Sequence, residues 1–188
     1  MRNTCLTCLM LLAFACSTGS HKTHAVSIDL NNKNLSAIPD SVLDNSNLTH
    51  LAIGSRAALL TPFEGFEEPE DRNHLTSLPD KLCNLQQLTV LSVSDNDLEQ
   101  LPACLGNLQQ LEKLDLSGNS KLDIRSAMPV LQELKKLKEL NLYGIVSVLK
   151  DTAWVRQQLS ATVEKLSITR ADLVKNYSTD NVSRKQEN

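Results

Sequence analysis

The most regular feature of the sequence is a spacing of apolar residues that returns after 23 positions. The first copy runs Leu78-Pro79-x-x-Leu82-x-x-Leu85-x-x-Leu88-x-x-Leu91-x-Val93-x-x-Asn96, and the second runs Leu101-Pro102-x-x-Leu105-x-x-Leu108-x-x-Leu111-x-x-Leu114-x-Leu116-x-x-Asn119. Every apolar position of the first copy is apolar in the second, and the proline and the asparagine coincide. This period indicates one small unit that is stacked several times.

Two hydrophobic periods alternate inside each unit and predict two kinds of element. In Leu91-x-Val93 two apolar residues flank an outward residue, as on a strand with one buried face. The three-residue steps at Leu82, Leu85 and Leu88 predict a short helical segment on the opposite side of the unit. One unit cannot bury its own leucines, so stacking must bury them against neighbouring units.

The strand pattern continues on both sides of the two matching copies. The second apolar residue of each strand falls at Leu30, Ile53, Val93, Leu116, Leu142 and Ile168. Successive positions are 23 or 26 residues apart, except for Ile53 and Val93, which are 40 residues apart. This longer spacing indicates an insertion over 55–72. We therefore expect an α/β solenoid of about six repeats over 26–173, with a parallel concave sheet and short helical or 3-10 segments on the convex side.

The asparagine of the pattern is expected to face inward and to satisfy backbone groups where the chain leaves the strand. It is present in the middle units as Asn73, Asn96 and Asn119 and is replaced in the others, so the terminal units are less regular. In the last unit, Val155, Leu159 and Val163 predict an α-helix over 150–161, with Trp154 as a lid over the last leucines.

These motifs resemble the leucine-rich repeat family in its 23-residue LPxxLxxLxxLxxLxLxxNxL form. The resemblance implies a non-catalytic module that binds a protein partner through its concave sheet. The larger outward residues of that face lie in the later repeats, and they are Lys113, Asp115, Glu139, Asn141, Tyr143 and Lys165. Tyr143 is the best single anchor candidate, because tyrosine is enriched at binding hot spots. The alternative is that this face is only a solvated sheet surface.

The insertion is the second candidate binding element. It carries Phe63 and Phe66 among five acidic residues, and it leaves the solenoid directly after a concave strand. Long loops in compact domains are commonly functional or disordered. The two phenylalanines therefore either contact a partner at the rim of the concave face or pack against the solenoid edge.

The first 16 residues, MRNTCLTCLMLLAFAC, have the features of an export signal. Arg2 precedes an apolar run that is shorter than the roughly 20 residues needed to span a bilayer. The leader resembles a bacterial lipoprotein signal, in which Cys16 would be acylated after removal of residues 1–15, although Ala13 and Phe14 depart from the preferred residues of that signal. Ordinary signal cleavage is the alternative. Residues 16–25 are expected to form a tether, and residues 174–188 a disordered tail.

Composition and motifs favour neither an enzyme nor a nucleic-acid binder. The net charge is −3 without a concentrated basic region, which argues against binding to nucleic acid. We find no nucleophile–base pair, metal-ligand spacing or phosphate-binding loop, so we expect no cofactor, metal or small-molecule substrate. When the 23-residue repeats are aligned, Cys83 and Cys104 do not occupy the same position but differ by two. This offset favours free thiols over a bond between neighbouring units.

Two functional hypotheses follow from the sequence. The first is a surface-tethered module that recognises a protein partner, with a non-lipidated secreted protein, bacterial or eukaryotic, as a variant of it. The second is a structural or envelope-spacer protein without a specific ligand.

Overall fold

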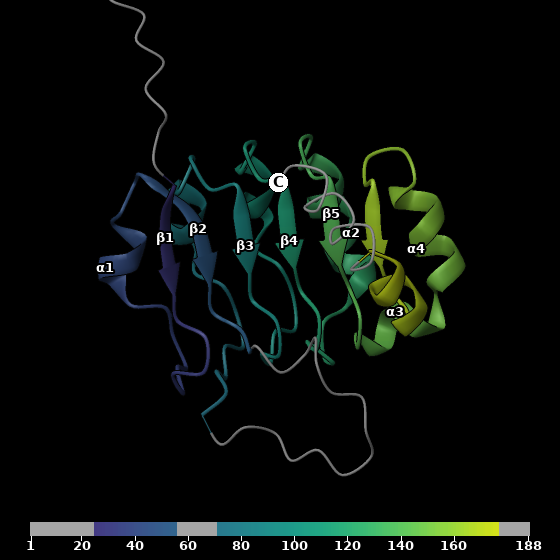
Figure 1. The fold of residues 1–188 in the computed structure, drawn as a ribbon, viewed down its shortest axis with the longest axis horizontal. Helices are drawn as coiled ribbons and strands as arrows, with labels where there is room; N and C mark the ends of the chain where they lie inside the picture. Colours follow the sequence, from purple (N-terminus) through teal and green to yellow (C-terminus); the bar gives the residue numbers. More distant parts are fainter. Residues whose placement is uncertain (1–24, 56–70, 177–188) are drawn as a thin grey trace, which may run out of the picture.

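The computed structural model describes residues 25–55 and 71–176, in which six strands form one parallel sheet in chain order (Figure 1). The strands are β1 (Val26–Asp29), β2 (Leu48–Ala52), β3 (Val90–Ser92), β4 (Lys113–Asp115), β5 (Glu139–Asn141) and β6 (Lys165–Ser167). The predicted register is confirmed, because the outward residues pair across the sheet in one row: Ser27, His50, Val90, Lys113, Glu139 and Lys165. The expected α/β solenoid of six repeats is therefore present.

Short helical segments return the chain behind the sheet, on the convex side (Figure 1). They are α1 (Asp40–Leu43), the 3-10 helices η2 (Asp80–Asn84) and η3 (Ala103–Asn107), α2 (Ile124–Glu133), α3 (Val146–Lys150) and α4 (Thr152–Leu159). The two 23-residue units form 3-10 turns, which suit leucines spaced by three. Among the residues that the structure describes, no helix is long and apolar enough to cross a membrane.

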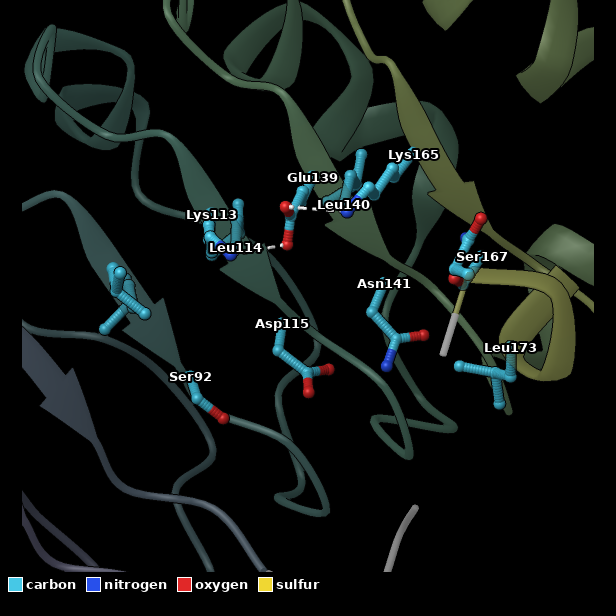
Figure 2. Close-up of a pocket in the computed structure, with 13 residues that line it drawn as sticks. Ser92, Lys113, Leu114, Asp115, Glu139, Leu140, Asn141, Lys165, Ser167 and Leu173 are labelled. Carbon is cyan, nitrogen blue, oxygen red and sulfur yellow. Dashed lines mark hydrogen bonds and ion pairs between the residues drawn. The ribbon is translucent and has the colours of Figure 1, made fainter. Parts of the chain in front are cut away.

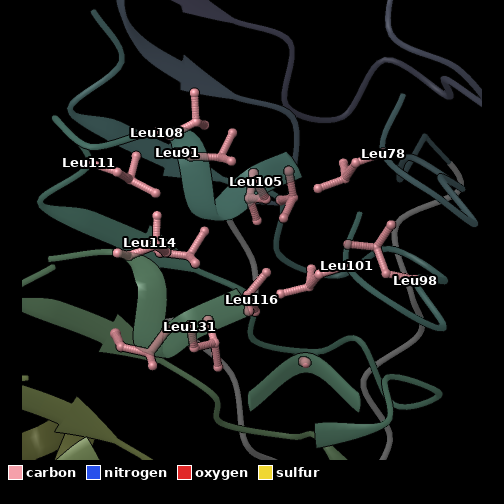
Figure 3. Packing of buried hydrophobic residues seen from close by; sticks show 14 of the residues in the cluster. Leu78, Leu91, Leu98, Leu101, Leu105, Leu108, Leu111, Leu114, Leu116 and Leu131 are labelled. Carbon is pink, nitrogen blue, oxygen red and sulfur yellow. The ribbon is translucent and has the colours of Figure 1, made fainter. Parts of the chain in front are cut away.

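The core lies between the sheet and the convex segments and consists largely of leucine (Figure 3). Leu91 and Leu114 have exposed fractions of 0% and 2%, whereas the neighbouring Ser92 faces outward and is half-buried. Each fully buried leucine side chain contributes about 1.5–3 kcal/mol of transfer free energy. Side chains along each strand thus point alternately into the core and onto the concave face, as the sequence predicted.

The buried asparagines join successive turns of the solenoid. The side-chain amide of Asn96 donates to the carbonyl oxygens of Ile53 (2.8 Å) and Val93 (3.1 Å), and its Oδ1 accepts from the backbone N–H of Leu75 (2.9 Å). Asn73 and Asn119 make equivalent bonds one repeat to either side. The predicted role of this column is confirmed, since each amide satisfies backbone groups that would otherwise be buried without partners.

The expectation of free thiols at Cys83 and Cys104 was wrong. The two residues form a disulfide between η2 and η3, with their Cα atoms 5.8 Å apart. A 3-10 helix turns about 120° per residue, so two positions of offset rotate a side chain by about 240°. One cysteine can therefore point forward to the next unit while the other points back, and the phase offset permits the bond.

The C-terminal end of the solenoid is closed by helices. Val155 and Leu159 on α4 are fully buried, and Trp154 packs against the core with the Arg125 guanidinium 4.7 Å from its ring centroid. The helix α4 is shorter than the predicted span 150–161 and follows a separate short α3. A further helical turn over 170–176 extends past residue 173, where we expected the repeat domain to end.

Candidate binding surface on the concave sheet

The outward side chains of β3 to β6 line a shallow groove of about 270 Å³ (Figure 2). The groove contains five of the predicted partner-binding residues, namely Lys113, Asp115, Glu139, Asn141 and Lys165. Their spacing follows directly from the register, because residues at equivalent repeat positions lie side by side on adjacent parallel strands. The structure therefore brings these five predicted residues together on one face, and their role in binding stays a prediction.

A row of three charged residues crosses the groove at the N-terminal ends of the strands (Figure 2). Glu139 lies between Lys113 and Lys165, with Nζ–carboxylate distances of 2.9 Å and 3.4 Å. These side chains are 30–51% exposed, so the pairs contribute only about 0–1 kcal/mol each to folding. Their main effect is to hold three long side chains in a defined arrangement on the face.

A second row at the C-terminal ends of the strands is uncharged except for one carboxyl group. It consists of Ser92, Asp115, Asn141 and Ser167. Asp115 Oδ1 accepts from the N–H (3.0 Å) and hydroxyl (2.6 Å) of Ser117. Burial raises the pKa of the Asp115 carboxyl, and hydrogen bonds from Ser117 and Asn141 oppose this only in part. The row presents donors and acceptors suited to a polypeptide backbone.

Tyr143 is not among the residues that line the groove. It lies two residues beyond the end of β5, immediately before Gly144, which has a φ of 79°. Its N–H donates to Asn141 Oδ1 (3.2 Å) and its carbonyl accepts from the N–H of Gly118 (2.8 Å). The anchor role of Tyr143 stays a prediction, while Phe63, Phe66 and Cys16 lie outside the described residues.

The groove residues that lie beyond β6 were missed from the sequence. Leu173 and Asn176 belong to the helical turn over 170–176 and complete the groove beside β6. This turn begins with a capping box, in which Thr169 Oγ1 accepts from the N–H of Asp172 and the Asp172 carboxylate accepts from the N–H of Thr169 (2.8 Å). The Thr-x-x-Asp spacing was the available signal.

A separate ionic cluster lies where the insertion rejoins the repeats. Arg72 contacts Asp97 at 3.3 Å and also donates to the carbonyl oxygens of Asn73 and Asp95. Burial raises the pKa of the Asp97 carboxyl, but Arg72, together with His74 and Lys121, outweighs it and lowers the pKa. The cluster therefore fixes the first residues after the insertion. No group of three metal-ligating side chains occurs in residues 25–55 and 71–176.

The sheet, the asparagine column and the groove define a repeat solenoid with an open concave face. The leucine-rich repeat family model matches residues 71–120, which cover the two regular units and the strands β3 and β4. The chain therefore contains leucine-rich repeats, and the solenoid that they form is the leucine-rich repeat fold.

Solved structures of similar proteins include an internalin from Listeria monocytogenes and a leucine-rich repeat protein from Leptospira interrogans. The internalin is 27% identical over 64% of this chain and 29% of its own, with a TM-score of 0.47. The Leptospira protein is 22% identical over 77% of this chain and 43% of its own, with a TM-score of 0.39. This chain thus spans less than half of either protein. Comparison with curated proteins gives no significant match.

Proposed function

We propose that this protein is an exported, membrane-tethered module that binds a protein partner in the groove over β3 to β6. The observation that carries the proposal is the separation of roles on each strand. The inward leucines fill the core, whereas the outward residues form an open groove in which charged and polar side chains are held in two rows. A central groove bordered by ordered side chains suits recognition of a polypeptide surface.

Export is supported by two independent features. The leader carries an apolar run that ends at Cys16, and Cys83 and Cys104 form a disulfide between two repeats. Structural disulfides persist in oxidising compartments and are rare in the cytosol. We therefore place the mature protein at the cell envelope or outside the cell, held to a membrane by a lipid on Cys16.

Affinity capture with groove variants tests the binding role. Asn141→Arg and Ser92→Arg place a long cation in the groove, while Ala153→Arg places the same side chain on the exposed surface of α4. We expect a partner captured from the native source by wild-type protein to be retained by Ala153→Arg and lost by the two groove variants. Thermal unfolding must confirm that all three variants fold. Equal capture by all four proteins would exclude the groove, and the spacer role would be favoured if none captured a partner.

A further inference from the structure

The charged row of the groove has acceptors that are already engaged and donors that are not. Glu139 Oε2 lies 2.9 Å from Lys113 Nζ, and Glu139 Oε1 lies 3.4 Å from Lys165 Nζ. A lysine ammonium group has several N–H donors, and Lys113 Nζ has Glu139 as its one partner among the described residues. The Lys113 side chain is 51% exposed, so its other donors are open to a ligand.

The second row of the groove shows the same imbalance. Asn141 Oδ1 accepts from the backbone N–H of Tyr143 (3.2 Å), and Asp115 Oδ1 accepts from the N–H and the hydroxyl of Ser117. Burial also raises the pKa of the Asp115 carboxyl, which disfavours its negative charge. The Ser92 hydroxyl, by contrast, has no hydrogen-bond partner within residues 25–55 and 71–176. The groove is therefore matched best by a ligand that supplies acceptors.

The charges of the groove favour a negative ligand. Lys113 and Lys165 flank the single carboxylate of Glu139, so the row is net positive, whereas the whole chain carries a net charge of −3. Lys113 stands at the end of this row (Figure 2), and its neighbour on β3 is the uncharged Val90. A carboxylate that approaches from the side of β3 reaches the Lys113 ammonium group without meeting Glu139 first.

Aliphatic side chains border the groove at both ends. Val90 is half-buried on β3, and Leu173 is half-buried beside β6. Adjacent parallel strands lie about 4.8 Å apart, so the intervals between β3 and β6 span about 14 Å. An extended polypeptide covers this distance with about four to five residues. The groove is thus sized for a short peptide segment that carries both aliphatic and acidic side chains.

We infer that the groove recognises an acidic peptide segment of its partner, in which a carboxylate contacts Lys113 and an aliphatic side chain contacts Val90. The acidic preference rests on the proposed function, because it specifies the chemistry of the partner that the groove binds. Glu139 then acts against the ligand, since it competes for the same ammonium group. Removing the charge of Glu139 should strengthen binding, whereas removing the charge of Lys113 should weaken it.

Selection from a random heptapeptide library displayed on phage tests the preference. The library is panned on the immobilised protein, and clones are classed as groove-dependent when they bind Ala153→Trp protein but not Asn141→Trp protein. The same bulky uncharged side chain blocks the groove in Asn141→Trp and lies on the exposed surface of α4 in Ala153→Trp. We expect groove-dependent clones to be enriched in Asp and Glu relative to the unselected library. Lys113→Glu protein should not give this enrichment.

Affinities of one selected peptide for matched variants separate a contact from non-specific attraction. Lys113→Met removes the charge and keeps the length of the side chain, and it should weaken binding about two- to fivefold. Glu139→Gln should strengthen binding by a similar factor. Lys150→Met removes the same charge from α3, outside the groove, and should leave the affinity unchanged. Isothermal titration calorimetry measures these affinities, and thermal unfolding confirms that each variant folds.

The outcomes separate the acidic preference from the proposed function. Groove-dependent clones without enrichment of Asp and Glu would overturn the preference and leave the groove as the binding site. Weaker peptide binding by Glu139→Gln protein would also overturn it. A library without groove-dependent clones would overturn it as well, and binding of alginate in the groove would then indicate an anionic polysaccharide. Acidic clones would support the preference even if no native partner is captured, whereas loss of a captured partner in the groove variants tests the proposed function whichever peptides are selected.

Discussion

The Asn96 side-chain amide donates to the carbonyl oxygen of Ile53 at 2.8 Å, although the two residues are 43 positions apart. This bond crosses the insertion. The strands β2 and β3 likewise pair directly, with Leu51 beside Leu91. The solenoid is therefore continuous through the point where the insertion leaves it, and stacking across that point does not depend on the length of the inserted chain.

Deletion of residues 56–70 should leave the solenoid folded. The spacing from Ile53 to Val93 would then become about 25 residues, which lies between the regular spacings of 23 and 26. We expect the melting temperature to change by no more than about 4 °C, as measured by circular dichroism. Deletion of residues 56–72 is the matched control. It also removes Arg72 and its contact with Asp97, so it should lower the melting temperature further. Unfolding of the shorter deletion would show that the insertion is part of the core.

The assignment of inward and outward residues on β3 can be tested by introducing an aspartate at each of two neighbouring positions. Leu91→Asp places an unpaired carboxylate in a fully buried position, whereas Ser92→Asp places it on the concave face. We expect Leu91→Asp to lower the free energy of unfolding by about 3 kcal/mol or more, and Ser92→Asp to change it by about 0.5 kcal/mol. Chemical denaturation of both variants measures the difference. Similar losses at the two positions would contradict the alternation of core and groove.

Reduction of the Cys83–Cys104 disulfide should destabilise the protein without changing its fold. The bond closes a loop with a sequence separation of 21, for which the chain-entropy relation gives about 3 kcal/mol. We expect a lower denaturation midpoint in reducing agent and the same loss in Cys83→Ala/Cys104→Ala protein. The double variant itself should not respond to reducing agent, which makes it the control. An unchanged midpoint of the wild-type protein under reduction would show that the bond contributes nothing to stability.

Most of the fold was predictable because one local rule is repeated. The alternation at Leu91 and Val93 and the three-residue steps after Leu82 fixed which side chains face inward, and stacking then determined the register of the whole sheet. The groove residues Lys113, Glu139 and Lys165 follow from that register. Repetition allowed a local pattern to predict tertiary contacts, which single elements of a non-repetitive fold do not permit.

The predictions failed where the repeat rule ends. The disulfide depends on the directions in which the two cysteine side chains point from their 3-10 helices. The position of a residue within the repeat does not give this direction. Leu173 and Asn176 lie beyond the last regular leucine, where one capping box determines the path of the chain. Tyr143 lies after β5 and is not among the residues that line the groove, and its role as an anchor stays a prediction.

Membrane attachment through Cys16 can be tested by substitution. Acylation requires the thiol of Cys16. The Cys16→Ser variant should therefore carry no lipid and remain as the uncleaved precursor. We expect the wild-type protein to fractionate with membranes, to incorporate a radiolabelled fatty acid and to migrate as the shorter mature form. Cys8→Ser is the matched control inside the leader and should behave as the wild type. Incorporation of the labelled fatty acid into Cys16→Ser protein, or its cleavage to the mature form, would contradict acylation of this residue.

The stability of the protein should respond to two aspartates in opposite directions with pH. Burial opposes ionisation of Asp172, but the N–H groups of Thr169 and Ile168 and the Arg156 guanidinium outweigh it and lower its pKa to about 2. Its stabilising contribution is therefore complete above the unfolded pKa of about 3.9 and is lost as the pH falls towards 2. The side chain is only 20% exposed, and we expect Asp172→Asn to lose about 2 kcal/mol at pH 7 and little at pH 2.

Asp115 should show the reverse effect, because burial raises its pKa above the unfolded value. The ionised carboxylate is then disfavoured in the folded state, so its cost is present at neutral pH and disappears as the pH falls through the unfolded pKa. Asp115→Asn keeps an oxygen that accepts from Ser117 and removes the charge, and it should raise the free energy of unfolding at pH 7 but not at pH 3. Denaturation curves of both variants across this range measure the two slopes. A loss of stability in Asp115→Asn at pH 7 would show that its hydrogen bonds outweigh desolvation.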